Sequence, residues 1–405
     1  MTIAETLAGP VAAGEMAGAV TLVWRDGRVL DAAAVGWSDI EAKVPLARDS
    51  LFRIASMSKP VTSVAAMMLL EEGRLALDEP IARRWAPEFR EMRVLRDPDG
   101  PLEDTIAAER PITFEDLLTH RAGVTYGDFH SGPIKPAYDA ALGASIDSHL
   151  TPDEWVARLA ALPLIAQPGA AFCYGHSTDL LGFLIARIEG APLGEVLARR
   201  IFRPLGMADT GFIVPPEKWG RRAAMHGFDA EGRLLKLAAV PGGAALPERP
   251  AAMTYEGGGA GLWSTVDDYL AFARLFVGAG AVDGVRLLTP ETIALMTTNR
   301  LTVAQRAGAK TLGMPVFTAG NGFGLGVAVT IDPATAAPIR GKGGLGTVSW
   351  PGAYGGWWQA DPTDGSVMIL LQHNMVDPEG LSEGHGLAGY GAILECHALG
   401  TALKA

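Results

Sequence analysis

The chain has 405 residues, of which 48% are hydrophobic, so it can bury a large core and exceeds the usual size of a single compact domain. Its formal net charge of -11 would repel phosphate backbones and anionic lipid, which argues against nucleic acid or a membrane surface as a partner. The two cysteines, Cys173 and Cys396, allow at most one bridge, so a disulfide framework does not hold this fold.

Residues 1–16 do not resemble a secretory signal, because they lack a basic start, carry Glu5 and are interrupted by Pro10. A membrane-spanning helix needs roughly 18 to 20 apolar residues. The nearest candidate, residues 61–70, ends at the acidic Glu71. We therefore expect a cytoplasmic protein with no membrane partner.

Strand patterns lie near both ends of the chain. The β-rich runs 20–24 and 29–35 flank a turn that contains Asp26 and Gly27, which predicts an antiparallel hairpin. After about residue 320 the alternation returns, and a helical tail closes the chain. These later segments are residues 322–331, 357–360 and 367–372 for the strands and residues 388–403 for the tail.

Helical patterns fill the middle of the chain. From Ser56 to Leu70 the pattern is that of a buried helix closed by Gly73, in which Pro60 is tolerable only in the first turn. Further helices are predicted at residues 113–119, 152–162, 178–189, 193–200 and 265–276, with surface excursions at 97–111 and 241–250. We predict an α/β fold of the α+β type: an antiparallel sheet flanked by helices and built from residues 1–75 and 310–405, with a mostly helical region inserted at 76–309.

Ser56 and Lys59 are the main candidate catalytic residues, because they lie three residues apart where the predicted helix begins. On a helix this spacing places both side chains on one face, within reach of each other. An amine beside a hydroxyl can orient it, lower its pKa or accept its proton, and free amides at a helix N-terminus stabilise developing negative charge. The pair favours a serine nucleophile, although a capping serine with a solvated lysine explains the tetrapeptide alone.

Two more motifs follow in order: Tyr-Gly-His at residues 174–176 and Trp-Pro-Gly at 350–352. Together with Ser-Met-Ser-Lys at 56–59, they resemble the three ordered motifs of the serine β-lactamase and penicillin-recognising superfamily. The most similar branch is the family VIII carboxylesterases, which share the class C β-lactamase fold. Flanking stretches also resemble the family, so the likeness spans nearly the whole chain. They are residues 116–123, 257–269 and 343–362.

The resemblance implies that Tyr174 takes the Ser56 proton during acylation and later activates water for deacylation. An unperturbed phenol has a pKa of about 10, and Lys59 would be the cation that lowers it. The third position of this motif, often Asn in β-lactamases, is His176. Its imidazole could donate a hydrogen bond into the site or pack beneath it.

The third motif departs from the β-lactamase pattern. Penicillin-recognising enzymes commonly place Lys-Thr-Gly or His-Thr-Gly here, and the esterase branch tends to have Trp-Gly-Gly. In this chain Trp350, Pro351 and Gly352 supply no cation, which favours neutral esters over β-lactams. Since Pro351 lacks an N–H, the amide of Ala353 is expected to complete an oxyanion hole with that of Ser56.

Other features are weaker. Tyr126 could line the acyl pocket, and His120 is expected to make a structural hydrogen bond. Lys342 and the two glycines after it are not taken as the third motif, because they precede the strand that resembles the family. Residues 341–346 formally match a dinucleotide-binding fingerprint, but no helix follows them, so we predict no such site. The histidines show neither His-Glu-x-x-His nor a Cys-His cluster with metal spacing, so we predict no metal and no cofactor.

The sequence therefore predicts a serine carboxylesterase that hydrolyses small, short-chain esters through an acyl-Ser56 intermediate, with acyl transfer to another alcohol as a side activity. A β-lactamase, a D-alanyl-D-alanine peptidase or another amide hydrolase is the alternative enzyme. A non-catalytic ligand receptor would not require Ser56, Lys59 and Tyr174 together. The expected partner is a small-molecule ester, and the oligomeric state stays open.

Overall fold

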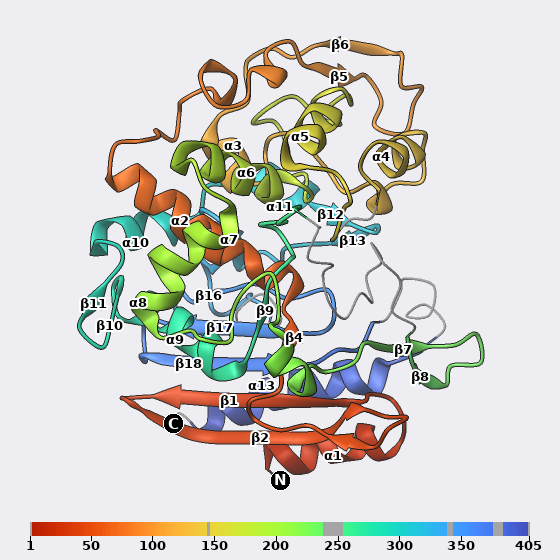
Figure 1. Cartoon of the computed structure of the whole chain (residues 1–405), viewed down its shortest axis with the longest axis vertical. Coiled ribbons are helices and arrows are strands. Elements are labelled where there is room, and N and C mark those ends of the chain that lie inside the picture. The colour runs from red at the N-terminus through yellow and green to blue at the C-terminus, as the bar shows by residue number, and fades with distance from the viewer. Residues whose placement is uncertain (1, 144–145, 238–253, 338–342, 376–383, 404–405) are drawn as a thin grey trace.

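The computed structural model describes residues 2–143, 146–237, 254–337, 343–375 and 384–403. Its main sheet is antiparallel, with the strand order β14-β15-β16-β17-β18-β1-β2-β3, and its labelled strands lie in the lower half of Figure 1. The strands are β1 (Gly18–Arg25), β2 (Arg28–Asp39), β3 (Val44–Pro45), β14 (Asn321–Phe323), β15 (Ala328–Thr330), β16 (Val348–Ser349), β17 (Trp357–Asp361) and β18 (Ser366–Leu371).

The two ends of the chain meet in the middle of this sheet. β1 pairs with β18 from Val20 opposite Leu371 to Arg25 opposite Ser366. The predicted hairpin is confirmed, because β1 continues into β2 through a tight turn at residues 26–27, where both φ angles are positive, 52° and 78°. The first strand therefore sits between a strand of the N-terminus and a strand of the C-terminus.

Side chains on the two faces of the central strands are buried in two separate hydrophobic cores. In β18, Val367 and Ile369 belong to the large core, whereas Met368 and Leu370 belong to a smaller one on the opposite face. α1 (Ile3–Ala12) and α13 (Leu387–Leu403) cover the smaller core, and α13 matches the predicted helical tail (Figure 1). α2 (Ser58–Glu71) and α9 (Val266–Val277) pack on the other face. Because successive side chains of a strand point to opposite faces, both faces of the sheet are apolar and both are covered by helices.

The rest of the described chain is mostly helical and lies outside the eight-stranded sheet. Its α-helices are α3 (Phe114–Leu118), α4 (Ile134–Leu142), α5 (Pro152–Ala160), α6 (Ser177–Glu189), α7 (Leu193–Leu197), α8 (Arg203–Leu205), α10 (Pro290–Met296) and α11 (Val303–Gly308), with a π-helical turn at Ala198–Phe202 between α7 and α8. Short strand pairs complete it: β4 (Phe52–Arg53) with β9 (Trp263–Ser264), β5 (Arg93–Leu95) with β6 (Thr105–Ala107), β7 (His226–Phe228) with β8 (Leu234–Lys236), β10 (Ala281–Val282) with β11 (Val285–Arg286), and β12 (Lys310–Thr311) with β13 (Met314–Pro315).

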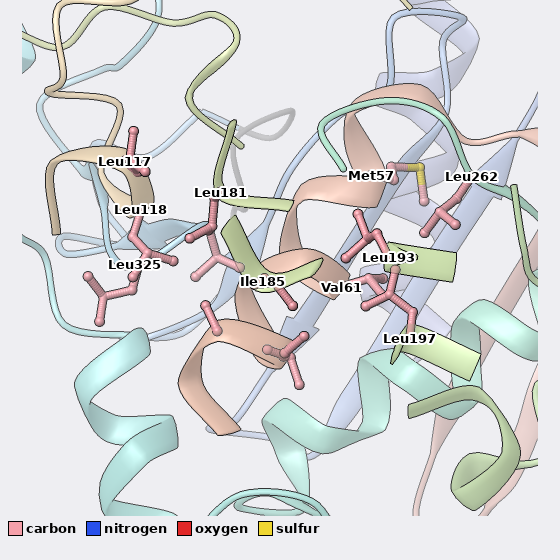
Figure 2. Packing of buried hydrophobic residues seen from close by; sticks show 14 of the residues in the cluster. Met57, Val61, Leu117, Leu118, Leu181, Ile185, Leu193, Leu197, Leu262 and Leu325 are labelled. Atoms are coloured by element: carbon pink, nitrogen blue, oxygen red, sulfur yellow. The ribbon is translucent and has the colours of Figure 1, made fainter. Parts of the chain in front are cut away.

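Helix α2 is buried from Ser58 to Met67, which fixes the side chains at its N-terminus. Figure 2 shows Val61 of α2 close to Leu193 and Leu197 of α7, with Met57 beside Leu262. Pro60 is the third residue of the helix and so lies in its first turn, as predicted. A helix held this tightly can present a charged residue at a fixed place.

Some expectations were wrong in detail. The predicted strand 322–331 is two strands, β14 and β15, because the chain turns at Gly324 and Gly326, the second of which has φ of +87°. The excursion at 97–111 is largely exposed but contains β6, and residues 241–250 lie outside the described part of the chain. The division at residues 75 and 310 stays a prediction, and the large core crosses it.

Candidate active site

Ser56 lies in a 3-10 turn (Ala55–Met57) that joins β4 to α2. It is half-buried, whereas the residues around it from 51 to 60 are buried. Ala55 has a φ of +46°, a left-handed conformation that costs a residue with a Cβ about 1–2 kcal/mol. The backbone is therefore strained where it turns the Ser56 hydroxyl out of the core, a pattern found at functional sites.

Hydrogen bonds from distant elements hold this turn. The amide of Ile54 donates to the carbonyl of Leu262 over 2.9 Å, and the amide of Leu262 donates to the Ser58 hydroxyl over 3.2 Å. The phenol of Tyr269 on α9 donates to the carbonyl of Met57 over 2.9 Å. The turn that carries Ser56 is thus tied by hydrogen bonds to Leu262, just before β9, and to helix α9.

Lys59 is fully buried and makes three hydrogen bonds, as many as an ammonium has N–H groups. Its Nζ is 3.2 Å from the Ser56 hydroxyl, 3.1 Å from the phenol oxygen of Tyr126 and 2.9 Å from the carbonyl oxygen of Gly259. The pairing predicted from the three-residue spacing is present. Sequence reasoning missed the contacts of Lys59 with Gly259 and with the Tyr126 hydroxyl. The place of Tyr126 in the acyl pocket stays a prediction.

The carbonyl that holds Lys59 belongs to a run of glycines, residues 257–259, between α2 and α6. The amide of Gly259 donates to the carboxylate of Asp179 over 2.8 Å. A Cβ on Gly259 would come within 2.8 Å of the same carboxylate, so a side chain there would force the loop away from α6. Three glycines in sequence were the available signal, but they did not indicate a contact with Lys59.

His176 packs beneath the site. Its Nδ1 is 2.9 Å from the carboxylate of Asp179, and its ring meets the ring of Tyr126 edge to face at 4.4 Å. Both the imidazole and the carboxylate are buried. Of the two alternatives for His176, the structure shows the second. The carboxylate thereby joins the second motif to the glycine loop that positions Lys59.

Tyr174 stands on the other side of Lys59, half-buried. The Lys59 ammonium lies 4.7 Å from the centre of its ring. The phenol oxygen accepts a hydrogen bond from the indole N–H of Trp350 over 2.9 Å. The ring of Phe129 stacks on Tyr174 at 6.0 Å, and that of Tyr126 meets it edge to face. The structure therefore brings the three predicted motifs together.

Tyr126 and Tyr174 differ in their surroundings. Burial first, and then the nearby Asp179 and Tyr174, raise the pKa of Tyr126 well above its usual value. Tyr126 is therefore a neutral phenol that can accept a hydrogen bond from Lys59, and Tyr174 is the more exposed of the two.

The loop of the third motif lies against the turn that carries Ser56. A Cβ on Gly352 would be 2.7 Å from the carbonyl oxygen of Ile54, and one on Gly356 would be 3.0 Å from the sulfur of Met57. The loop closes through a bond from the Gly352 amide to the Gly356 carbonyl, 2.7 Å long, and Ala353 at its tip is exposed. The oxyanion role of the Ala353 amide stays a prediction.

His120 corrects an expectation. Its ring lies among aromatic rings, 4.8 Å from that of Tyr174 and 5.7 Å from those of Phe172 and Phe323. Neither ring nitrogen has a hydrogen-bond partner among the described residues, so the predicted side-chain hydrogen bond is wrong. Burial, with the nearby Lys59 charge, holds the pKa of His120 well below its usual value, which makes it an uncharged packing residue.

Arg53, which precedes the Ser56 turn, is held by a buried ion pair and by a buried histidine. Arg53 and Asp147 form a buried ion pair with a nitrogen to oxygen distance of 2.6 Å. The amide of Arg53 also donates to Nε2 of His373, over 2.6 Å, and Nδ1 of His373 lies 3.0 Å from the carbonyl of Ala223. Burial lowers the pKa of His373 to about 3, so this histidine is uncharged at neutral pH.

The structure describes only part of the weaker sequence motifs. Lys342 and Gly341 lie outside the described residues, and the glycines at 343–346 lead into strand β16, not into a helix. In the part of the chain that the structure describes, no three His, Cys, Asp or Glu side chains are grouped to hold a metal ion. Nor does any described helix combine the length and apolar character that a membrane crossing requires.

Comparison with known proteins identifies the family of this site. The model of the Beta-lactamase family matches residues 3–388, nearly the whole chain. The chain belongs to the β-lactamase family. The order of its three motifs and their meeting around Ser56 agree with this membership.

Two relatives and one solved structure extend the match. An uncharacterized protein of Mycobacterium tuberculosis is 48% identical over 89% of this chain and 87% of its own length. Esterase EstB of Burkholderia gladioli is 34% identical over 91% of this chain and 88% of its own. The solved structure of EstCE1, a hydrolase with promiscuous acyltransferase activity, has a TM-score of 0.76 at 27% identity and covers 97% of both chains.

These matches confirm two predictions. The class C β-lactamase-like fold, with its antiparallel sheet and flanking helices, is the fold of this chain. The resemblance to the family VIII esterases and β-lactamase-like serine hydrolases is also confirmed, so this member of the β-lactamase family is a serine hydrolase.

Proposed function

We propose that this protein is a carboxylesterase that hydrolyses neutral esters through an acyl-Ser56 intermediate. The observation that carries the proposal is the position of the buried Lys59 ammonium, 3.2 Å from the Ser56 hydroxyl, at the start of α2. The similarity to Esterase EstB supports ester substrates, and the promiscuous acyltransferase activity of EstCE1 supports acyl transfer as a second outcome of the same intermediate.

In the proposed mechanism, Ser56 attacks the ester carbonyl while its proton passes to Tyr174. The amides of Ser56 and Ala353 hold the oxyanion, and Lys59 stabilises the negative charge that develops around the nucleophile. Tyr174 then returns the proton to the departing alcohol. Water, or another alcohol, resolves the acyl-enzyme by the same steps in reverse.

The walls of the site favour a neutral, apolar acyl group. The rings of Tyr126 and Tyr174 lie 5.4 Å and 4.7 Å from the Lys59 nitrogen, and those of Phe129 and Trp350 pack against Tyr174. By the order of the motifs, Trp350 would replace the cation with which a β-lactamase attracts the carboxylate of the drug. Short acyl chains stay part of the proposal.

The test is a rate comparison between a p-nitrophenyl acetate and butyrate series and a chromogenic cephalosporin. We expect turnover of the esters, which Ser56→Ala abolishes, and much slower cephalosporin hydrolysis. Full esterase activity in Ser56→Ala would refute the nucleophile. A cephalosporin hydrolysed far more efficiently than any short ester would instead favour a β-lactamase.

A further inference from the structure

The bond between Trp350 and Tyr174 has a direction that chemistry fixes. An indole nitrogen only donates, so the phenol oxygen of Tyr174 must accept the 2.9 Å hydrogen bond. The Trp350 side chain is 3% exposed and is held at 5.1 Å by the edge-to-face ring of Phe323. The donor is therefore buried and cannot turn away from the phenol without disturbing the core.

We propose that Trp350 is a positioning residue whose indole N–H stabilises the phenolate form of Tyr174, so that Tyr174 can act as the base at neutral pH. The inference rests on the proposed esterase function and assigns Trp350 a part other than contact with substrate. A hydrogen bond to the ionised form of an acid favours ionisation, and its effect is larger in a buried site. Lys59, 4.7 Å from the centre of the same ring, adds a positive charge on the other side.

The same bond directs the proton when Tyr174 is neutral. Because the indole occupies one acceptor position of the oxygen, the phenol hydrogen must point elsewhere. During acylation the Ser56 oxygen forms its bond to the carbonyl carbon, the π electrons move to the oxyanion, and the Ser56 proton goes to the Tyr174 phenolate. The tetrahedral intermediate then collapses, the carbon to alkoxide bond breaks, and that proton moves to the departing oxygen.

An indole differs from a lysine in one respect that bears on substrate choice. It donates to the phenolate without placing a net charge beside the substrate. The third motif therefore adds no charge of its own to the site, which suits neutral esters. A third-motif cation would stabilise the phenolate but would also attract carboxylates.

The experiment compares the pH dependence of kcat/KM for p-nitrophenyl acetate in wild type and Trp350→Phe. Phenylalanine keeps an aromatic ring and removes the N–H. We expect the acid limb to move upward by about one to two pH units, since hydrogen bonds to charged groups are worth that much in pKa. Trp219→Phe is the matched control, because Trp219 also donates its indole N–H over 2.9 Å, to the carbonyl of Val214.

Two further variants separate this role from packing. In a Tyr174→Phe background, Trp350→Phe should cost little additional activity, because the bond has no acceptor left. Trp350→His restores a donor and should return part of the shift. If Trp350→Phe does not fold, Trp350→Leu, which also lacks the N–H, serves as the test variant. An acid limb that coincides with wild type, or an undiminished cost in the Tyr174→Phe background, would overturn the proposal. Esterase activity that persists in Ser56→Ala would instead refute the proposed function on which this inference rests.

Discussion

The ion pair between Asp147 and Arg53 tests how burial changes the contribution of an ion pair to the free energy of unfolding. The two charged atoms are 2.6 Å apart and both side chains are only 1% exposed. Asp147→Ala removes the carboxylate but leaves the guanidinium buried without that counter-charge. Breaking a buried pair from one side costs about 3–5 kcal/mol, so the free energy of unfolding should fall by that amount.

The chain provides a matched control on its surface. Arg48 and Asp267 are also 2.6 Å apart, but their side chains are 49% and 47% exposed. Asp267→Ala should cost only about 0–1 kcal/mol, because water screens such a pair. Urea unfolding followed by tryptophan fluorescence measures both. Equal losses for the two variants would refute the reasoning, since the pairs share a distance and differ in burial.

Two further predictions concern the glycine loop and the buried histidine. Gly259→Ala should push the glycine loop away from Asp179 and lower kcat on the order of 100-fold, the effect of a misplacement of about 1 Å. Gly9→Ala is the control and should leave kcat unchanged, because the space around Gly9 is open. Equal kcat values for the two variants in steady-state assays would contradict this prediction. His373 has its pKa lowered from 6.5 to about 3, so between these values the unfolded chain binds a proton that the native state does not. The free energy of unfolding should therefore fall as pH drops below 6.5, by up to about 1.4 kcal/mol per pH unit from this group. His373→Gln should reduce that slope in urea titrations and the exposed His149→Gln should not; an unchanged slope in the first would contradict the assignment.

Local patterns made much of the fold predictable. The Asp-Gly turn between two β-rich runs is enough to specify the β1–β2 hairpin, and Pro60 with its neighbours places the start of α2 within two residues of Ser56. The Ser56 and Lys59 contact follows from helical spacing alone. In each case the interacting residues are close in sequence.

The parts that were missed depend on contacts between distant residues. The carbonyl of Gly259 is 200 residues from Lys59, and the phenol of Tyr126 is 67 residues away, so no local period reports either bond. His120 was expected to make a hydrogen bond because histidine is polar, but three aromatic rings from two distant segments surround it. Its environment is a property of the tertiary fold.

Mass spectrometry of the intact protein tests most directly whether Ser56 carries the acyl group. After brief incubation with an activated ester or phosphonate, we expect one added acyl or phosphonyl mass, which peptide mapping places on Ser56. Ser58→Ala should still be labelled, since the Ser58 hydroxyl is buried and accepts the Leu262 amide. A label on any other residue, or one that persists in Ser56→Ala, would contradict the proposed nucleophile.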